Sequence, residues 1–229
     1  MDFIINTDTN IFLALNNLHA AFWDYFMYTF SGRWIWVPAY AVVAAVLVRL
    51  FGWRNGIMII AATAIAVALS DQTCATFIRP YVQRLRPANP DNPISSLVHI
   101  VDGYRGGKYG FPSCHAANTF AFATTISLVL CRRYITVALF AWALLNCYSR
   151  IYLGVHYPGD LLTGACIGAI YGALMYGAIR LAGKHITFLR PSAPLRKSAA
   201  TSYSYGCIYI LLLTTIGIAA YSAVCTAIN

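Results

Sequence analysis

The feature that most constrains this chain is a series of six apolar stretches, each close to the length that crosses a lipid bilayer. A helix of about 20 residues spans the roughly 30 Å of hydrocarbon, and in lipid only helices or closed barrels satisfy every backbone polar group. The stretches cover residues 34–51, 56–78, 115–131, 135–153, 159–182 and 204–227. The sequence therefore predicts an all-α fold, a polytopic membrane helical bundle with about six spans.

Composition supports this fold class, because 59% of the residues are hydrophobic and only 10% are charged. Soluble domains carry about 25% charged residues, so a soluble enzyme or a disordered chain is disfavoured. Residues 10–31 are aromatic but interrupted by polar side chains, which is typical of helices lying in the membrane interface. One additional span over 10–31 is the alternative. We expect N-terminal interfacial helices over 1–33, a membrane core over 34–182, a cytoplasmic linker over 183–203 and an additional C-terminal transmembrane helix over 204–229.

Basic residues indicate how the bundle is oriented. Nine of the sixteen fall in three connections on one side, which the positive-inside rule assigns to the cytoplasm: Arg49, Arg54, Arg132, Arg133, Arg180, Lys184, Arg190, Arg196 and Lys197. The long loop 79–114 and both termini then lie outside, in a bacterial-type inner membrane. The net charge of +9 is scattered between apolar runs, so it favours membrane lipids and an anionic lipid substrate over nucleic acid. No obligate protein partner is expected.

Three short segments on the predicted external face carry the candidate chemistry. They are Arg79–Pro87, Pro112–His115 and Ser149–Asp160. In the last, a proline favours the first turn of a helix, so Asp160 can reach back to His156 and leave one ring nitrogen free. In the second, Ser113 can cap a helix that begins near Cys114, with His115 beside it as an acid or base.

Arginines supply the predicted anion-binding groups. Arg79 and Arg86 are two helical turns apart and share a face if the helix continues past Pro80, and Arg150 adds a third guanidinium. Guanidinium groups match phosphate oxygens in a bidentate way and stay charged. Three other basic residues of the loop are expected as rim charges that attract an anion: Arg84, Arg105 and Lys108. A short amphipathic helix is expected over 95–104.

No metal or cofactor is expected. The chain contains seven Asp and no Glu, so the carboxylate cluster of a two-metal hydrolase is missing from the sequence. Its seven cysteines include no Cys-x-x-Cys pair, which disfavours a zinc site.

The three segments, in this order and spacing, resemble the signature of the type 2 phosphatidic-acid phosphatase superfamily, which also contains vanadium haloperoxidases. The family pattern is K-x6-R-P, then P-S-G-H, then S-R-x5-H-x3-D; this chain reads R-x6-R-P, P-S-C-H and S-R-x5-H-x3-D. Arg79 stands in place of the family lysine and Cys114 in place of the family glycine. Neither departure touches the two histidines or Asp160, so activity is expected to survive.

The resemblance implies a role for each matched residue. His156 is the nucleophile that forms a phosphohistidine, Asp160 orients it, and His115 protonates the leaving oxygen and then activates water. The phosphoryl group is bound by Arg79, Arg86, Ser113, Cys114 and Arg150.

The resemblance also implies a lipid phosphate phosphatase. Undecaprenyl pyrophosphate is the first expectation for its substrate. The alternatives within the class are a lipid A phosphatase and a phosphatidylglycerol-phosphate or phosphatidic-acid phosphatase. Outside this class, the chain could be a lipid-phosphate transporter or a haloperoxidase.

Overall fold

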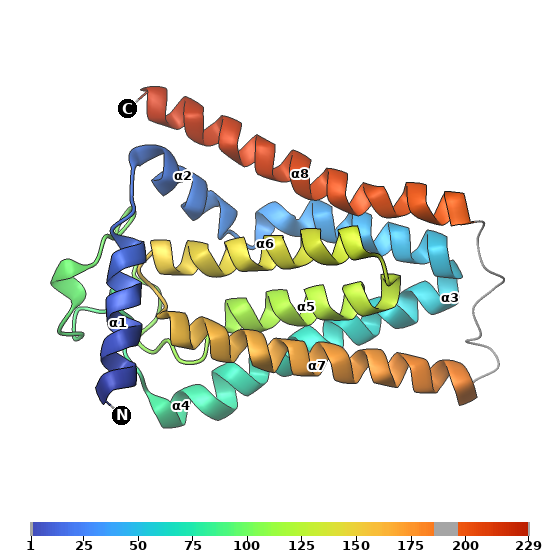
Figure 1. The fold of residues 1–229 in the computed structure, drawn as a ribbon, viewed down its shortest axis with the longest axis horizontal. Helices are drawn as coiled ribbons and strands as arrows, with labels where there is room; N and C mark the ends of the chain where they lie inside the picture. Colours follow the sequence, from blue (N-terminus) through green and yellow to red (C-terminus); the bar gives the residue numbers. More distant parts are fainter. Residues whose placement is uncertain (1, 186–196, 229) are drawn as a thin grey trace.

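The computed structural model describes residues 2–185 and 197–228, which are helical apart from the loops at one end. The helices are α1 (Asp2–Asn16), α2 (Ala21–Phe30), α3 (Val37–Gln72), α4 (Arg79–Val82), α5 (Cys114–Leu130), α6 (Arg133–Tyr152), α7 (Pro158–His185) and α8 (Lys197–Ile228). The two halves of α3 and helices α5 to α8 run along the long axis of the molecule (Figure 1).

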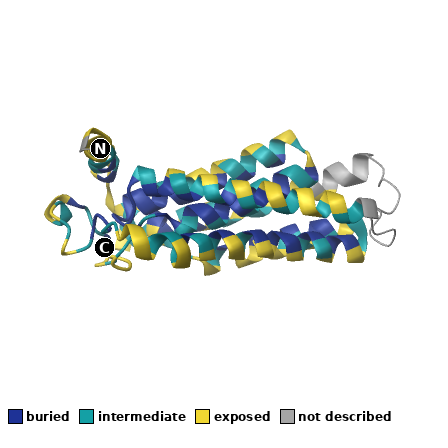
Figure 2. Ribbon diagram, turned by 90° about the horizontal axis from the view of Figure 1, so that it is seen from below, coloured by how far each residue is buried: buried dark blue, intermediate teal, exposed yellow. Residues whose placement is uncertain are grey.

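Within the described residues, four helical segments are long and apolar enough to cross a membrane. They are Trp34–Val82, Arg133–Tyr152, Pro158–Gly183 and Tyr205–Ile228, and α5 is a shorter apolar helix. Buried residues lie on the inner faces of the helices and exposed ones on their outer faces (Figure 2), which carry side chains such as Leu174 and Leu213. An apolar exterior suits lipid, so the predicted all-α membrane bundle is confirmed.

The first two apolar stretches form the two arms of α3, which reverses direction at Gly52. This glycine has a φ of 78° and a ψ of 162°, a backbone conformation that disfavours side chains. The arms approach closely just beyond it, since a Cβ added at Gly56 would lie 2.7 Å from the Cα of Val48. The turn lies at the end of the bundle opposite the long loop (Figure 1).

Helices α5 and α7 are in close contact along a row of small residues. A Cβ added at Gly164, Gly168 or Gly172 would lie 2.3, 2.1 or 2.8 Å from a backbone oxygen of the segment that begins at Ser113. Small residues at this spacing let membrane helices approach closely. The packing places the starts of α5 and α7 side by side.

The N-terminal helices are separate, so the alternative of one span over 10–31 is wrong. The chain leaves helix between Asn16 and Ala21, and α1 lies across one end of the bundle (Figure 1). Buried Asn16 fixes this break because its amide donates to the backbone oxygens of Ile151 and Tyr152, at 3.1 and 2.9 Å.

Two further expectations differ from the structure. The helix expected over 95–104 is only one short turn at Ser95–Leu97. The backbone is extended at Val98, and both Asp102 and Gly103 have a positive φ, so the helix cannot continue. The last helix begins at Lys197 instead of residue 204. Residues 186–196 of the expected linker, including Arg190 and Arg196, lie outside the described residues.

Candidate active site

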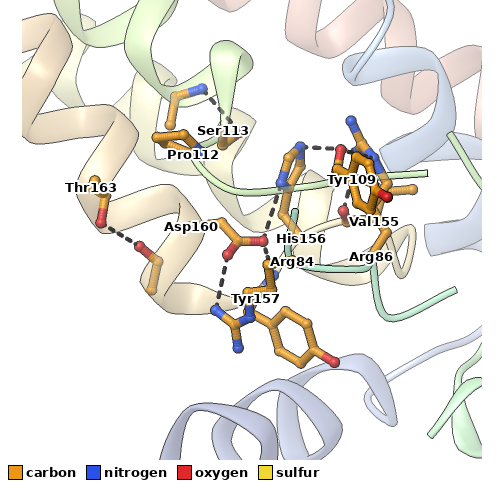
Figure 3. A network of polar contacts seen from close by, with 12 residues as sticks. Arg84, Arg86, Tyr109, Pro112, Ser113, Val155, His156, Tyr157, Asp160 and Thr163 are labelled. Atoms are coloured by element: carbon orange, nitrogen blue, oxygen red, sulfur yellow. Dashed lines mark hydrogen bonds and ion pairs between the residues drawn. The ribbon is translucent and has the colours of Figure 1, made fainter. Parts of the chain in front are cut away.

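The three sequence segments meet at the end of the bundle that α1 covers. The backbone N–H of Ser113, before α5, donates to the backbone oxygen of Asp160 in the first turn of α7, at 3.0 Å. Two parts of the loop 79–114 also pair here, since the backbone N–H of Arg86 donates to the backbone oxygen of Lys108 at 3.1 Å. Residues from distant parts of the chain therefore surround His156 (Figure 3).

His156 and Asp160 form a buried pair. His156 Nδ1 lies 3.4 Å from Asp160 Oδ2, and the same oxygen accepts the Tyr157 backbone N–H at 3.0 Å. Because a carboxylate only accepts, it favours the tautomer that carries its proton on Nδ1. The lone pair of His156 is then on Nε2, on the side away from the carboxylate (Figure 3).

Arg86 lies at that second nitrogen. Its Nη1 is 3.1 Å from His156 Nε2 and 3.2 Å from the backbone oxygen of Val155, and its Nε donates to the Tyr109 oxygen at 3.1 Å. The expectation that Arg79 and Arg86 share a helical face is wrong. Helix α4 ends at Val82, where Gln83 takes a left-handed conformation with a φ of 49°, so Arg86 reaches the site from the loop.

Electrostatics keep the central histidine neutral. Burial, with the charges of Arg86, Arg150 and Arg79 around it, holds the pKa of His156 well below its usual range. Burial and the charges of Arg150 and Arg79 lower the pKa of Arg86 to about 10, which leaves it charged at neutral pH. A neutral imidazole keeps an unprotonated nitrogen, here contacted by Arg86, and the guanidinium groups around it can bind an anion.

The second histidine lines a small cavity at the same end. This cavity of about 220 Å³ is lined by Tyr28, Ser31, Gly32, Arg33, Tyr104, His115, Arg150 and Leu153. Arg150 is buried and donates to the hydroxyls of Ser31 and Tyr104. A larger apolar groove of about 650 Å³ along α3 and α5 contains no residue of the three segments, whereas the small cavity contains His115 and Arg150 from two of them.

Arg79 and Cys114 contact each other at the start of α5. Arg79 Nη2 donates to the Pro112 oxygen and to Cys114 Sγ, both at 2.9 Å. That sulfur also faces the Asp71 backbone, and Cys114 is not among the residues that line the small cavity. Ser113 is buried, and its hydroxyl accepts the Ala116 N–H at 3.4 Å. Direct phosphate binding by Ser113 and Cys114 stays a prediction.

Buried polar atoms of two arginines lack partners. In the described part of the chain, the Nε atoms of Arg79 and Arg150 are buried with no hydrogen bond. Buried donors are normally paired, and an exception calls for an explanation. An anion bound between these side chains would supply one.

Sequence reasoning missed two groups in the site. Arg84, expected at the rim, instead binds the buried Asp160 carboxylate at 2.9 Å; only its position two residues before Arg86 hinted at this. Gly110 passes over the His156–Asp160 pair, where an added Cβ would lie 3.1 Å from Asp160 Oδ2 and 3.5 Å from His156 Nδ1. By contrast, Lys108 pairs with exposed Asp91, as a rim charge should.

Over residues 2–185 and 197–228, no three His, Cys, Asp or Glu side chains are grouped so that they could hold a metal ion. The described groups are instead histidines and guanidinium groups, which suit covalent phosphoryl transfer.

A neutral buried histidine among arginines, at one end of an apolar helical bundle, suits a membrane phosphatase that acts on lipid phosphates. The chain belongs to the PAP2 superfamily, whose family model matches residues 55–184.

Relatives extend this match to almost the whole chain. It is 44% identical to a lipid A 4'-phosphatase from Bacteroides thetaiotaomicron over 98% of this chain and 99% of that protein. It is 32% identical to a lipid A 4'-phosphatase from Porphyromonas gingivalis over 95% of this chain and 90% of that one. The fold is similar to the crystal structure of a transmembrane PAP2-type phosphatidylglycerolphosphate phosphatase from Bacillus subtilis, with a TM-score of 0.60, 19% identity, and coverage of 79% and 88%. The enzyme is thus a multi-pass membrane lipid phosphate phosphatase.

Proposed function

We propose that this enzyme removes a phosphate group from lipid A through a phosphohistidine formed on His156. The observation that carries the substrate assignment is the full-length match to the lipid A 4'-phosphatase from Bacteroides thetaiotaomicron. That match includes α1, α2 and α8, which lie outside the family model. These relatives favour the lipid A alternative over undecaprenyl pyrophosphate, the first expectation from the sequence.

In the first step, His156 Nε2 attacks phosphorus and the bond from phosphorus to the lipid oxygen breaks. The leaving oxygen takes a proton from His115, which enters this step as an imidazolium stabilised by the bound phosphate anion. The Nη1–H group of Arg86 donates a hydrogen bond to His156 Nε2. Phosphate oxygens of the substrate compete for this N–H group. Binding therefore frees the nucleophile while Arg86, Arg79 and Arg150 stabilise the charge on the transferring group.

In the second step, water attacks the phosphohistidine. His115 accepts a proton from that water, the P–N bond breaks, and inorganic phosphate leaves with His156 neutral again. While His156 Nε2 carries the phosphoryl group and Nδ1 still carries a proton, the ring is positive. The carboxylate of Asp160 balances that charge. Every proton and bond is accounted for by protein groups and water, so the proposed route requires no metal ion.

A phosphate-release panel tests the substrate and the mechanism together. Purified enzyme is assayed on lipid A phosphorylated only at the 4' position or only at the 1 position, on undecaprenyl pyrophosphate and on phosphatidic acid, with and without EDTA. We expect the 4'-phosphorylated lipid to give the highest kcat/KM and EDTA to have no effect. A preference for undecaprenyl pyrophosphate would overturn the lipid A assignment. Loss of activity in EDTA that a divalent ion restores would overturn the metal-independent route.

We also propose that the active site faces the periplasm. The loop that carries it lies at the end of the bundle opposite the basic connections between α5 and α6 and within α3 (Figure 1). Positive connections stay in the cytoplasm, which leaves the catalytic end outside.

A further inference from the structure

A chain of alternating charges runs from α1 to the catalytic pair. Asp8 Oδ2 on α1 lies 2.7 Å from Arg84 Nη2, and Arg84 Nη1 lies 2.9 Å from Asp160 Oδ1. The other oxygen of Asp160 faces His156. One guanidinium group thus bridges a carboxylate of the N-terminal helix and the carboxylate that orients the nucleophile.

The bridge is held in one geometry by its surroundings. Asp8 Oδ1 accepts the backbone N–H of Gly159 at 2.8 Å, at the start of α7. The Arg84 guanidinium carbon lies 3.8 Å from the centre of the Tyr157 ring. Side chains of Asp8 and Arg84 are only 13% and 24% exposed, so water screens their interaction less than at an open surface.

Sharing of Arg84 has an electrostatic consequence for Asp160. An arginine that serves one carboxylate alone would neutralise it, and two carboxylates around one guanidinium leave a net negative charge. Phosphorylation on Nε2 makes the His156 ring positive, so the reaction needs that negative charge beside Nδ1. Without the charge on Asp8, Arg84 would draw Asp160 towards itself and weaken its hold on His156.

We propose that Asp8 and Arg84 are positioning residues of the reaction, and that Asp8 on α1 acts on His156 through Arg84 and Asp160. This inference rests on the proposed nucleophilic role of His156. It also makes α1 part of the catalytic end, although α1 lies outside the family model over residues 55–184.

Amide and carboxylate variants at position 8 test the proposal. Asp8→Asn keeps an oxygen acceptor for Gly159 but removes the charge that faces Arg84. We expect kcat to fall about tenfold on the panel lipid that the wild type hydrolyses best, with KM unchanged within twofold. Asp8→Glu restores the charge and should recover a substantial part of kcat. Asp91→Asn is the matched control, because Asp91 pairs with Lys108 at the exposed surface, away from the site, and it should behave as wild type.

A double-mutant cycle separates positioning from a structural role. If Asp8 acts through Arg84, Asp8→Asn should cost nothing further in an Arg84→Gln background. Wild-type kcat in Asp8→Asn, a rise in KM alone, or additive losses in the cycle would overturn the proposal. If Asp8→Asn does not fold, Asp8→Ser carries the test because it also removes the charge, with a lower kcat at unchanged KM expected and a wild-type kcat contradicting the proposal.

His156→Ala is assayed in parallel to keep the two proposals distinct. An inactive His156→Ala with a fully active Asp8→Asn removes the positioning role and leaves the proposed mechanism in place. An active His156→Ala removes the mechanism and the positioning role together.

Discussion

At the scale of single residues, His156 is a buried imidazole with a carboxylate at one nitrogen and a guanidinium group at the other. The two contacts agree on one tautomer, and the surrounding arginines disfavour a second positive charge. The residue is therefore neutral at neutral pH and has a lone pair on the side where Arg86 lies. These are the properties that a nitrogen nucleophile needs.

Replacing His156 by Ala should lower kcat by more than about a thousandfold, because a covalent nucleophile has no substitute in the proposed route. The measurement is phosphate release by purified, monodisperse protein, with the elution profile as the control for folding. Brief exposure to ³²P-labelled substrate should label the wild type with an adduct that is stable to alkali and labile to acid, and should leave the variant unlabelled. A variant that keeps a tenth of the activity would rule out this role.

Gly110→Ala tests the loop backbone over the catalytic pair. Its Cβ would lie 3.1 Å from Asp160 Oδ2 and 3.2 Å from Arg86 Cγ, so these groups must shift by a few tenths of an ångström. We expect at least a tenfold loss of kcat, because small displacements of reacting groups are costly. Gly107→Ala, in the same loop, meets nothing within 4 Å and should retain activity. Equal activities in the two variants would contradict this interpretation.

At the scale of helices, the site depends on how closely α5 approaches α7. His115 is the second residue of α5, and Asp160 lies in the first turn of α7. A row of glycines on α7 faces the backbone of α5, so the helix starts come together without large side chains between them. The backbone hydrogen bond from Ser113 to Asp160 then ties the two ends.

Gly168→Ala should separate these helices. Its Cβ would lie 2.1 Å from the backbone oxygen of Ala117, a distance that requires the backbones to move apart. We expect a lower melting temperature in detergent and lower activity. Gly177→Ala, on the same helix, meets nothing within 4 Å and should leave both unchanged. The measurement is thermal unfolding followed by loss of monodisperse protein; matching melting curves for the two variants would contradict the packing argument.

The spacing of residues in the sequence predicts some contacts of the site, and other contacts depend on the tertiary fold. His156 and Asp160 lie on either side of the start of α7, so a four-residue spacing predicts their contact. Arg86 depends instead on where α4 ends, and the left-handed Gln83 that ends it carries no strong sequence signal. The contact of Asp8 with Arg84 joins α1 to a distant loop, which needs the tertiary fold.

At the scale of the whole molecule, the basic connections between helices lie at one end of the bundle and the candidate active site lies at the other. The turn of α3 near Arg49 and Arg54 and the connection at Arg132 and Arg133 lie at one end, and the loop with the site lies at the other (Figure 1). The start of α1 and the end of α8 both lie towards the site (Figure 1). This arrangement matches the alternation of loops predicted from the apolar stretches.

Reporter fusions should reveal the orientation. We expect fusions within 131–134 and 185–200 to report a cytoplasmic position, and a fusion at residue 95 to report a periplasmic one. The physical reason is that basic connections resist translocation. Alkaline phosphatase, active only outside, and a fluorescent protein, fluorescent only inside, provide opposite readouts at each position. The reverse pattern would place the active site in the cytoplasm.

The position of the candidate active site at one end of the bundle determines where the two products go. Phosphate is soluble only in water, whereas a dephosphorylated lipid remains in the bilayer. Reaction products that partition into different phases become dilute with respect to each other as soon as they leave the cavity. The reverse reaction then depends on the concentration of phosphate in the surrounding medium, and hydrolysis proceeds to completion without any coupled source of energy.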